Sequence, residues 1–217
     1  MGFALRNGVT FCDVSDRLIF LDVAEDRYFC LHYETELALR RIIGGEAGTS
    51  DLSDRLVGLE LLIKTEGAEV PTPCFLPSRP DMSLIDLPPA RKDLTELAAA
   101  LAGLARARHS LRRRGLGRTL DRLAHAKSVS VPARSTTRLC AVATAFERTA
   151  RLVRSHDQCL PRAIAITRRC AAKGLPATLV IGVRLRPFAA HSWVQNGDCL
   201  INDRIDVVRT YTPILAL

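Results

Sequence analysis

The sequence predicts an α+β fold in two domains: a small one with strands followed by helices, and a larger, helix-rich one that contains an antiparallel sheet. The distribution of charged residues supports this division. Residues 1–80 hold 8 basic and 13 acidic side chains (net −5), whereas residues 81–217 hold 23 and 10 (net +13). Six of the 11 prolines lie at residues 71–89, and proline disfavours both helix and central strand. We therefore place domains at residues 1–78 and 91–217, joined by a proline-rich linker at 79–90.

Composition narrows the class of protein. Of 217 residues, 47% are hydrophobic and 25% charged, which is typical of a globular chain. The seven cysteines include no Cys-x-x-Cys pair, so we expect no metal site and no disulfide scaffold. No apolar run is long enough to span a bilayer, and the N-terminus lacks the pattern of a signal peptide. We expect a reduced, cytoplasmic protein that does not bind membranes.

The first domain has the element order of a small winged-helix domain. Runs rich in β-branched and aromatic residues predict three strands, at residues 8–13, 17–22 and 27–32. A helix is expected at 34–43, Asp51 or Ser53 can cap a second, and residues 61–63 lead towards the end of a third short helix. Winged helices often bind DNA, but a net charge of −5 repels phosphates. A peptide added to a strand edge suits this domain better, and a structural cap without a partner is the alternative.

The middle of the chain is basic and helical. Apolar spacing predicts helices at about 91–108, 111–126 and 135–152. Residues 105–138 hold ten basic side chains and one acidic one, Asp121. Such a surface could bind nucleic acid, a nucleotide or an acidic peptide. We favour a solvated helix face or a docking surface for the acidic domain, since the chain contains no phosphate-binding loop motif.

Cys159 is the candidate nucleophile. Pro161 is expected at the first position of a helix that ends near Lys173 and Gly174. Unpaired N–H groups and a partial positive charge at a helix N-terminus favour a thiolate and can bind an oxyanion. The other six cysteines lack this setting and are interpreted as packing residues. His156 lies close to Cys159 in sequence, which by itself is weak evidence for a role.

A strand carrying His191 follows and supplies the candidate base. Residues 177–183 and 190–195 are predicted strands, and Asn196-Gly197 predicts a hairpin turn. A two-residue turn places Asn202 opposite His191, a three-residue turn places Asp203 there, and Asp206 is a more distant candidate. Trp193 shares the face of His191 and could shield it from water. Each residue alone is ordinary, but the order Cys, His, acid or amide is typical of a nucleophilic triad.

The second domain resembles the transglutaminase-like, papain-type cysteine peptidases of lasso peptide biosynthesis, the leader-removing B proteins. The motifs that carry this resemblance are Cys159-Leu160-Pro161-Arg162-Ala163, Gly174-Leu175-Pro176-Ala177, Val180-Ile181-Gly182-Val183-Arg184, Pro187-Phe188-Ala189-Ala190-His191-Ser192-Trp193-Val194, Asn202-Asp203 and Tyr211-Thr212-Pro213-Ile214. The first domain is similar to the RiPP recognition element, a winged helix-turn-helix that binds leader peptides. That similarity is carried by the element order and by Arg27-Tyr28-Phe29-Cys30-Leu31.

The resemblance implies a function and partners. Cys159 would attack the bond between leader and core, His191 would transfer the proton and Asp203 would orient His191. The precursor's leader would bind the first domain. The residues implied for this contact are Tyr28, Phe29, Cys30, Leu31, Leu59 and Leu62. An asparagine-synthetase-like lasso cyclase would be the partner, and any ATP requirement would belong to the maturation complex, because no cofactor is expected in this chain.

Three other functions remain open from the sequence. The same constellation could transfer an acyl group to an amine, as transglutaminases do. The protein could instead be a DNA-binding or protein-binding regulator with an inactive papain-like domain, which the acidic first domain argues against. Finally, the whole chain could be a scaffold in which Cys159 is structural.

Overall fold

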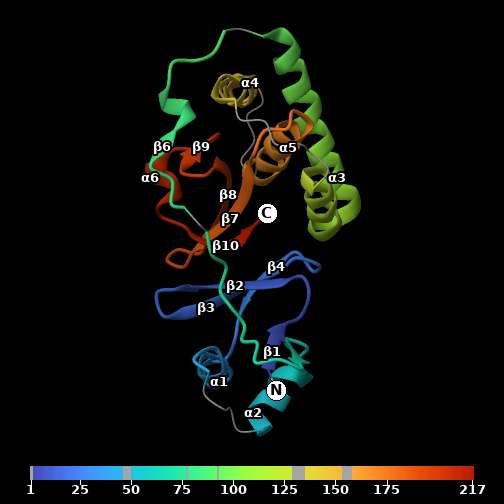
Figure 1. The fold of residues 1–217 in the computed structure, drawn as a ribbon, viewed down its shortest axis with the longest axis vertical. Coiled ribbons are helices and arrows are strands. Elements are labelled where there is room, and N and C mark those ends of the chain that lie inside the picture. The colour runs from blue at the N-terminus through green and yellow to red at the C-terminus, as the bar shows by residue number, and fades with distance from the viewer. Residues whose placement is uncertain (1, 46–49, 77, 92, 129–134, 153–157) are drawn as a thin grey trace. The chain divides into compact units, whose positions relative to one another are not determined.

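The chain divides into two compact units, Met1–Cys74 and Phe75–Leu217 (Figure 1). The computed structural model describes residues 2–45, 50–76, 78–91, 93–128, 135–152 and 158–217. The boundary falls inside the proline-rich stretch, because residues up to Cys74 bond to the first unit. The backbone N–H of Cys74, for instance, donates to the carbonyl of Phe11 at 2.8 Å.

The first unit is built on a three-stranded antiparallel sheet. Its order is β2 (Val9–Val14), β3 (Arg17–Asp22) and β4 (Arg27–Cys30), so β3 is central. Helices α1 (Tyr33–Ile43) and α2 (Ser50–Gly58) follow. These elements match the three strands and two helices that the sequence predicts, but α2 begins at Ser50, so neither Asp51 nor Ser53 is its N-cap.

A second, two-stranded sheet in the first unit was not predicted. β1 (Gly2–Leu5) pairs antiparallel with β5 (Leu62–Thr65), and Leu5 lies opposite Leu62. The expectation of a third short helix leading out of residues 61–63 is therefore wrong. Each strand has only four residues, so the pattern is too short to separate strand from helix until the distant partner is known.

Aromatic stacking fills the core of the first unit. The ring centroids of Phe11 and Phe20 lie 5.5 Å apart, and those of Phe20 and Phe29 lie 5.1 Å apart. Leu39 of α1 and Leu56 of α2 are fully buried against the same cluster. Burial of the apolar faces of both helices against one face of the sheet accounts for the stability of this unit.

The second unit contains a five-stranded sheet. Its order is β10 (Thr212–Ala216), β7 (Thr178–Arg184), β8 (Ala189–Asn196), β9 (Cys199–Leu200) and β6 (Met82–Ser83). All pairs are antiparallel except β6 with β9. Strand β10 is an addition to the predicted sheet, and it covers the free edge of β7.

Helix α5 (Cys159–Ala172) is the central helix of the second unit. It packs against β7 and β8, and α3 (Leu94–Ser128) and α4 (Thr136–Leu152) pack against it in turn (Figure 1). Its residues Ile164 and Ile166 are almost completely buried. The short helix α6 (Ile205–Val208) follows the sheet. Because α5 lies between the sheet and the other helices, its N-terminal residue Cys159 is held rigidly beside the strands.

Two predicted helices form α3, which is kinked at Gly115. This residue has φ 74° and ψ −179°, a conformation that only glycine adopts readily. The side chain of Thr119 donates to the Gly115 carbonyl at 2.7 Å, which restarts the hydrogen bonding after the kink. The break was expected between residues 108 and 111, where the sequence has no glycine.

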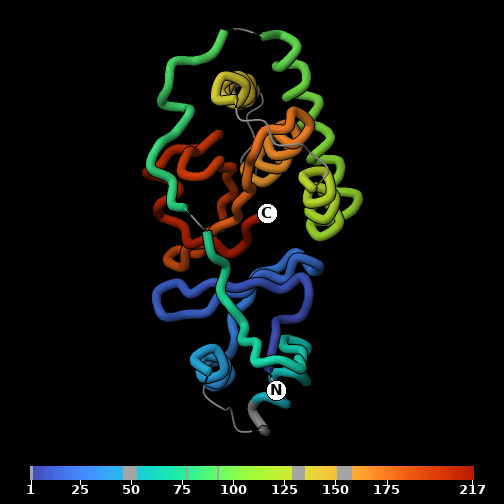
Figure 2. The backbone as a smooth tube through the Cα atoms, in the orientation of Figure 1, coloured from blue at the N-terminus to red at the C-terminus, as the bar shows by residue number. Residues whose placement is uncertain are grey.

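The segment at 79–90, expected to be a linker, belongs to the second unit. Met82 and Ser83 pair with Cys199 and Leu200, and a 3-10 turn, η1 (Leu84–Asp86), follows. Figure 2 shows the extended course of this part of the chain. The prolines of this segment lie outside the strand: Pro80 precedes β6, and Pro88 and Pro89 follow η1. Among the helices that the structure describes, none combines the length and the apolar character needed to cross a membrane.

Candidate active site

Cys159 is the first residue of α5. The backbone N–H of Arg162 donates to the Gln158 carbonyl at 3.0 Å, which makes Gln158 the N-cap. Pro161 is therefore the third residue of the helix and not the first, as had been expected. All three positions lie in the first turn, where a backbone N–H has no intrahelical acceptor, so the proline costs the helix no hydrogen bond.

His191 lies on β8, directly opposite Gly182 of β7. Its ring centroid is 6.4 Å from that of Trp193 and 5.2 Å from that of Tyr211. A Cβ atom at position 182 would lie 2.7 Å from Cζ3 of Trp193 and 3.0 Å from Cβ of Tyr211. Glycine is therefore required at position 182 for both aromatic rings to pack beside His191. Trp193 is 1% exposed, consistent with the proposed shielding of His191 from water.

Asp203 bonds directly to His191. Its Oδ2 lies 2.5 Å from Nε2 of the imidazole, and Oδ1 accepts the Arg204 backbone N–H at 2.8 Å. With Nε2 committed to the carboxylate, Nδ1 is the nitrogen that remains for the thiol of Cys159. Asp206, the more distant candidate, pairs instead with Arg204 at 3.5 Å.

The hairpin after His191 has neither of the two expected registers. Gln195 pairs with Leu200 and Asn196 with Cys199, and the ladder ends there. The backbone N–H of Val194 then donates to Oδ1 of Asn202 at 2.7 Å, while Ile201 N–H donates to the Val194 carbonyl. Because a side-chain oxygen replaces the next ladder acceptor, the chain turns away from the strand. Asp203 reaches His191 from this bend and not from a paired strand position.

The thiol and the imidazole favour their charged forms. Burial opposes ionisation of Cys159, but hydrogen bonding and the positive charge of His191, with a contribution from Ser192, leave the pKa of Cys159 below its ordinary value. Burial likewise opposes protonation of His191, but Asp203 and Cys159 together raise the pKa of His191 to about 9. The two side chains therefore stabilise each other's charged forms, a thiolate and an imidazolium, and this charged pair is the reactive form of a nucleophilic cysteine.

Four other cysteines have a raised pKa, whereas the pKa of Cys159 is lowered. Burial raises the pKa of Cys12 and Cys170 to about 12. Burial also raises the pKa of Cys74 and Cys199. Cys30 is exposed on β4, so its interpretation as a packing residue is wrong. The lowered pKa sets Cys159 apart chemically from these four thiols.

A cavity of about 220 Å³ opens at the catalytic residues. It is lined by Gln158, Cys159, Arg162, His191, Ser192, Asn202 and Asp203. Ser192 is 4% exposed, and its Oγ lies 3.9 Å from Sγ of Cys159. Gln158, Arg162 and Ser192 were not identified as site residues from the sequence, although Gln158 and Ser192 are direct neighbours of Cys159 and His191. His156 lies outside the described residues.

The residues implied for leader binding do not lie together on one element: some lie on or just after β4, one follows α2, and one packs in the core. Tyr28, Phe29 and Cys30 lie on β4, an edge strand of the sheet, and Leu31 follows it. Leu59, just after α2, is 58% exposed. Leu62 is 1% exposed and packs in the core, so its side chain is not available to a ligand. The structure has β5 at this position, where the sequence was expected to lead into the end of a short helix.

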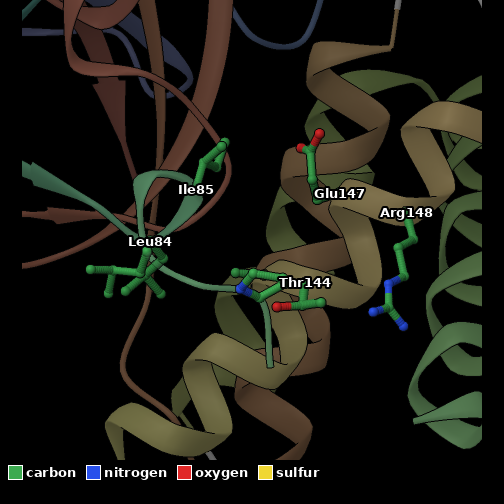
Figure 3. A pocket seen from close by; sticks show the side chains of 8 residues that line it. Leu84, Ile85, Thr144, Glu147 and Arg148 are labelled. Atoms are coloured by element: carbon green, nitrogen blue, oxygen red, sulfur yellow. The ribbon is translucent and has the colours of Figure 1, made fainter. Parts of the chain in front are cut away.

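A second cavity of about 220 Å³ lies between η1 and α4. Figure 3 shows Leu84 and Ile85 on one side and Thr144, Glu147 and Arg148 of α4 on the other. Thr144 is engaged by the Ala90 backbone N–H, which donates to its Oγ1 at 3.0 Å. None of the residues that line this cavity belongs to the Cys–His–Asp group.

The fold and the site together define a class of protein: a Cys-His-Asp protein built on a helix N-terminus and an antiparallel sheet. Comparison with known families agrees. Residues 91–216, which include all three catalytic candidates, match the family described as the transglutaminase-like superfamily. The chain belongs to this superfamily.

One curated protein is similar over a shorter stretch. It is the microcin J25-processing protein McjB of Escherichia coli, which is 47% identical over 47 residues. That stretch covers 22% of this chain and 23% of the relative. No solved structure matches the chain significantly.

Proposed function

We propose that this protein is a cysteine peptidase that removes the leader from a lasso peptide precursor. The observation that carries the proposal is the hydrogen-bonded Cys159, His191 and Asp203 group, with Asp203 2.5 Å from His191. The superfamily match covers this group, and the similarity to a microcin-processing protein supports a peptide precursor as the substrate.

The geometry supports a two-step hydrolysis. The Cys159 thiolate attacks the carbonyl carbon at the junction of leader and core. The tetrahedral intermediate collapses as His191 gives its proton to the departing amine, which is the new N-terminus of the core. Water, deprotonated by His191, then cleaves the thioester and releases the leader as a free acid. Asp203 holds the imidazole in position through both steps.

The first unit would bind the leader. Within the described residues, β4 pairs with β3 alone, so its outer edge offers backbone donors and acceptors to an extended peptide. Tyr28 and Phe29 are half-buried there and Cys30 is exposed; Leu31, which follows β4, is half-buried, and Leu59, just after α2, is exposed. The cyclase that would close the macrolactam and the cytoplasmic location stay predictions.

Cys159→Ala tests the catalytic part of the proposal. The variant removes the nucleophile and keeps the fold, so cleavage of the precursor, followed by mass spectrometry, should stop while leader affinity is unchanged. Cys140→Ala is the matched control, because Cys140 is a half-buried cysteine on α4 outside the catalytic cavity. Cleavage by Cys159→Ala at the wild-type rate would show that the nucleophile lies elsewhere.

Charged substitutions on the full chain test the leader-binding part. Cys30→Asp at the edge strand and Leu59→Asp should weaken binding of a fluorescent leader peptide by about tenfold or more, since each places a charge in an apolar contact. Leu94→Asp is the control, because Leu94 is 76% exposed and lies in the second unit. Unchanged leader affinity in both variants would remove the first unit from the proposal.

Acyl transfer to an amine is the second candidate, since the matching family is described as transglutaminase-like. It uses the same first step but ends on an amine instead of water. Precursor incubated with wild-type protein and an added primary amine distinguishes the two. A leader that carries a free carboxylate supports hydrolysis, and one that carries the amine as an amide supports transfer.

A further inference from the structure

Two side chains in the catalytic cavity hold buried polar atoms that bond to nothing. Gln158 is 8% exposed, and in the part of the chain that the structure describes neither its Oε1 nor its Nε2 has a hydrogen-bond partner. Nε of Arg162 is also buried, and it too has no hydrogen-bond partner among the described residues. Buried polar groups without partners destabilise a fold, and where they persist they often serve a ligand.

Both side chains are fixed on one face of α5. Arg162 lies four residues after Gln158, and the two are joined by the backbone hydrogen bond that begins the helix. Residues with this spacing are neighbours on the helix surface. Both line the cavity that contains Cys159, so both side chains lie beside the nucleophile. The terminal torsion of glutamine is soft, and a small rotation turns Nε2 towards the cavity.

Other polar side chains of this cavity already have partners. His191 bonds Asp203 at 2.5 Å, and the side chain of Asn202 accepts from Val194 at 2.7 Å. The hydroxyl of Ser192 points to the thiol of Cys159. Among the described residues of the cavity, Gln158 and Arg162 are the ones whose side chains hold buried donors without a partner.

A carbonyl oxygen under attack is the acceptor that fits these donors. When Cys159 adds to a carbonyl carbon, the oxygen becomes an anion beside the start of α5, while His191 is engaged with the leaving group. Donors that meet this oxygen only after it has gained charge lower the barrier and leave substrate binding unchanged.

We propose that Gln158 and Arg162 form an oxyanion-binding subsite: Nε2 of Gln158 donates a hydrogen bond to the oxygen of the attacked carbonyl, and the Arg162 guanidinium stabilises its charge. The inference deepens the proposed function and requires acyl chemistry at Cys159, but it does not require a particular precursor. It makes Gln158 a catalytic residue and limits the substrate class to carbonyl compounds, amides and esters.

Two reactions of the same thiol on the full chain separate this role from others. Iodoacetamide alkylates Cys159 at a saturated carbon, with iodide leaving and no oxyanion formed. The ester p-nitrophenyl acetate acylates Cys159 through a tetrahedral oxyanion and releases p-nitrophenolate. Gln158→Met should slow acylation by about 10²–10³-fold and change alkylation by less than about threefold. Arg162→Met should act in the same direction, and Arg162→Lys should recover part of the loss.

Thermal unfolding gives an independent readout. Replacing an unpaired buried amide by an apolar side chain of similar length removes a desolvation penalty, so Gln158→Met should melt at the wild-type temperature or above it. Gln158→Ala serves as a second variant if Gln158→Met does not fold. Arg168→Met is the control, because Arg168 is exposed on the same helix and should change neither reaction.

Three outcomes would overturn the subsite. In the first, acylation by Gln158→Met equals the wild-type rate. In the second, acylation and alkylation fall together, which would place Gln158 in the activation of the thiolate. In the third, wild-type Cys159 is alkylated but never acylated, which would end the acyl chemistry and the proposed function with it. In the first two outcomes the proposed function stands.

Discussion

The hydroxyl of Ser83 donates a hydrogen bond of 2.6 Å to the backbone carbonyl of Asp203. Ser83 is 4% exposed and lies in the segment that the sequence predicts to be a linker. Its Oγ also accepts the Ile85 backbone N–H at 3.2 Å, which caps η1. One hydroxyl thus joins the entry strand of the second unit to the residue that orients His191.

Ser83→Ala should therefore impair catalysis without touching the substrate. The change leaves a carbonyl without its donor, which costs about 1–3 kcal/mol, and lets Asp203 drift from His191. We expect kcat to fall by about tenfold while KM stays nearly constant. Ser83→Thr keeps the hydroxyl and should recover activity, and Ser128→Ala at the exposed end of α3 is the control. A full kcat in Ser83→Ala would mean that the loop holds Asp203 without this bond.

Asn202 and Asp203 have different roles, which substitution can separate. Asp203→Asn removes the charge that orients His191, so kcat should fall by about 10³–10⁴-fold. Asn202→Asp keeps an oxygen acceptor for the Val194 N–H and should retain most of the activity. Asn202→Ala loses the acceptor and should lower both stability and turnover. If Asn202→Asp were as inactive as Asp203→Asn, the assignment of the orienting residue would be wrong. Steady-state kinetics with a thermal melt gives both quantities.

The pH dependence follows from the Cys159 and His191 pair. The pKa of Cys159 is lowered, so alkylation by iodoacetamide should reach half its maximum below the pH of about 8.5 typical of a free thiol. Burial opposes protonation of His191, but Asp203 and Cys159 raise its pKa to about 9, so turnover should decline above about pH 9 as the imidazolium that protonates the leaving group is lost.

The raised pKa of His191 also makes the free energy of unfolding depend on pH. The folded pKa of His191 lies above its unfolded value of about 6.5. Its contribution to the free energy of unfolding is fully present below about pH 6.5 and disappears as the pH rises through about 9.

Asp203→Asn should move the alkaline decline in turnover to lower pH. An unchanged profile in that variant would contradict the role given to the carboxylate.

Gly182→Ala tests the packing around His191. The added Cβ would lie 2.7 Å from the Trp193 ring and 3.0 Å from Tyr211. Overpacking of this kind costs about 1–3 kcal/mol, and the displaced rings would disturb His191. We expect a lower melting temperature and reduced turnover. Gly103→Ala is the matched control. Gly103 lies inside α3, and an added Cβ would make an ordinary 3.7 Å contact with Ala165 of α5, so the change should stabilise the fold by about 0.5–1 kcal/mol. Equal stability of Gly182→Ala and wild type would show that the rings can move aside.

Much of the fold could be predicted because its signals are local. The strands at β2, β3, β7 and β8 and the start of α5 follow from periodicity, Pro161 and the Asn196-Gly197 turn. Elements whose existence depends on a distant partner were missed. β1 forms on β5, β10 on β7 and β6 on β9, and none of these short strands carries a distinctive pattern of its own.

The sequence by itself determined that Cys159 lies just before or on the first turn of a helix and that His191 follows on a strand, because capping, proline placement and strand alternation act over a few residues. The tertiary structure alone decided how Asp203 meets His191, through the Asn202 bend and the bond from Ser83, 120 residues away along the chain. It also decided that Gln158 and Arg162 are left with unpaired atoms beside the thiol. These properties depend on which groups meet and which remain without partners, and chain neighbours do not fix that.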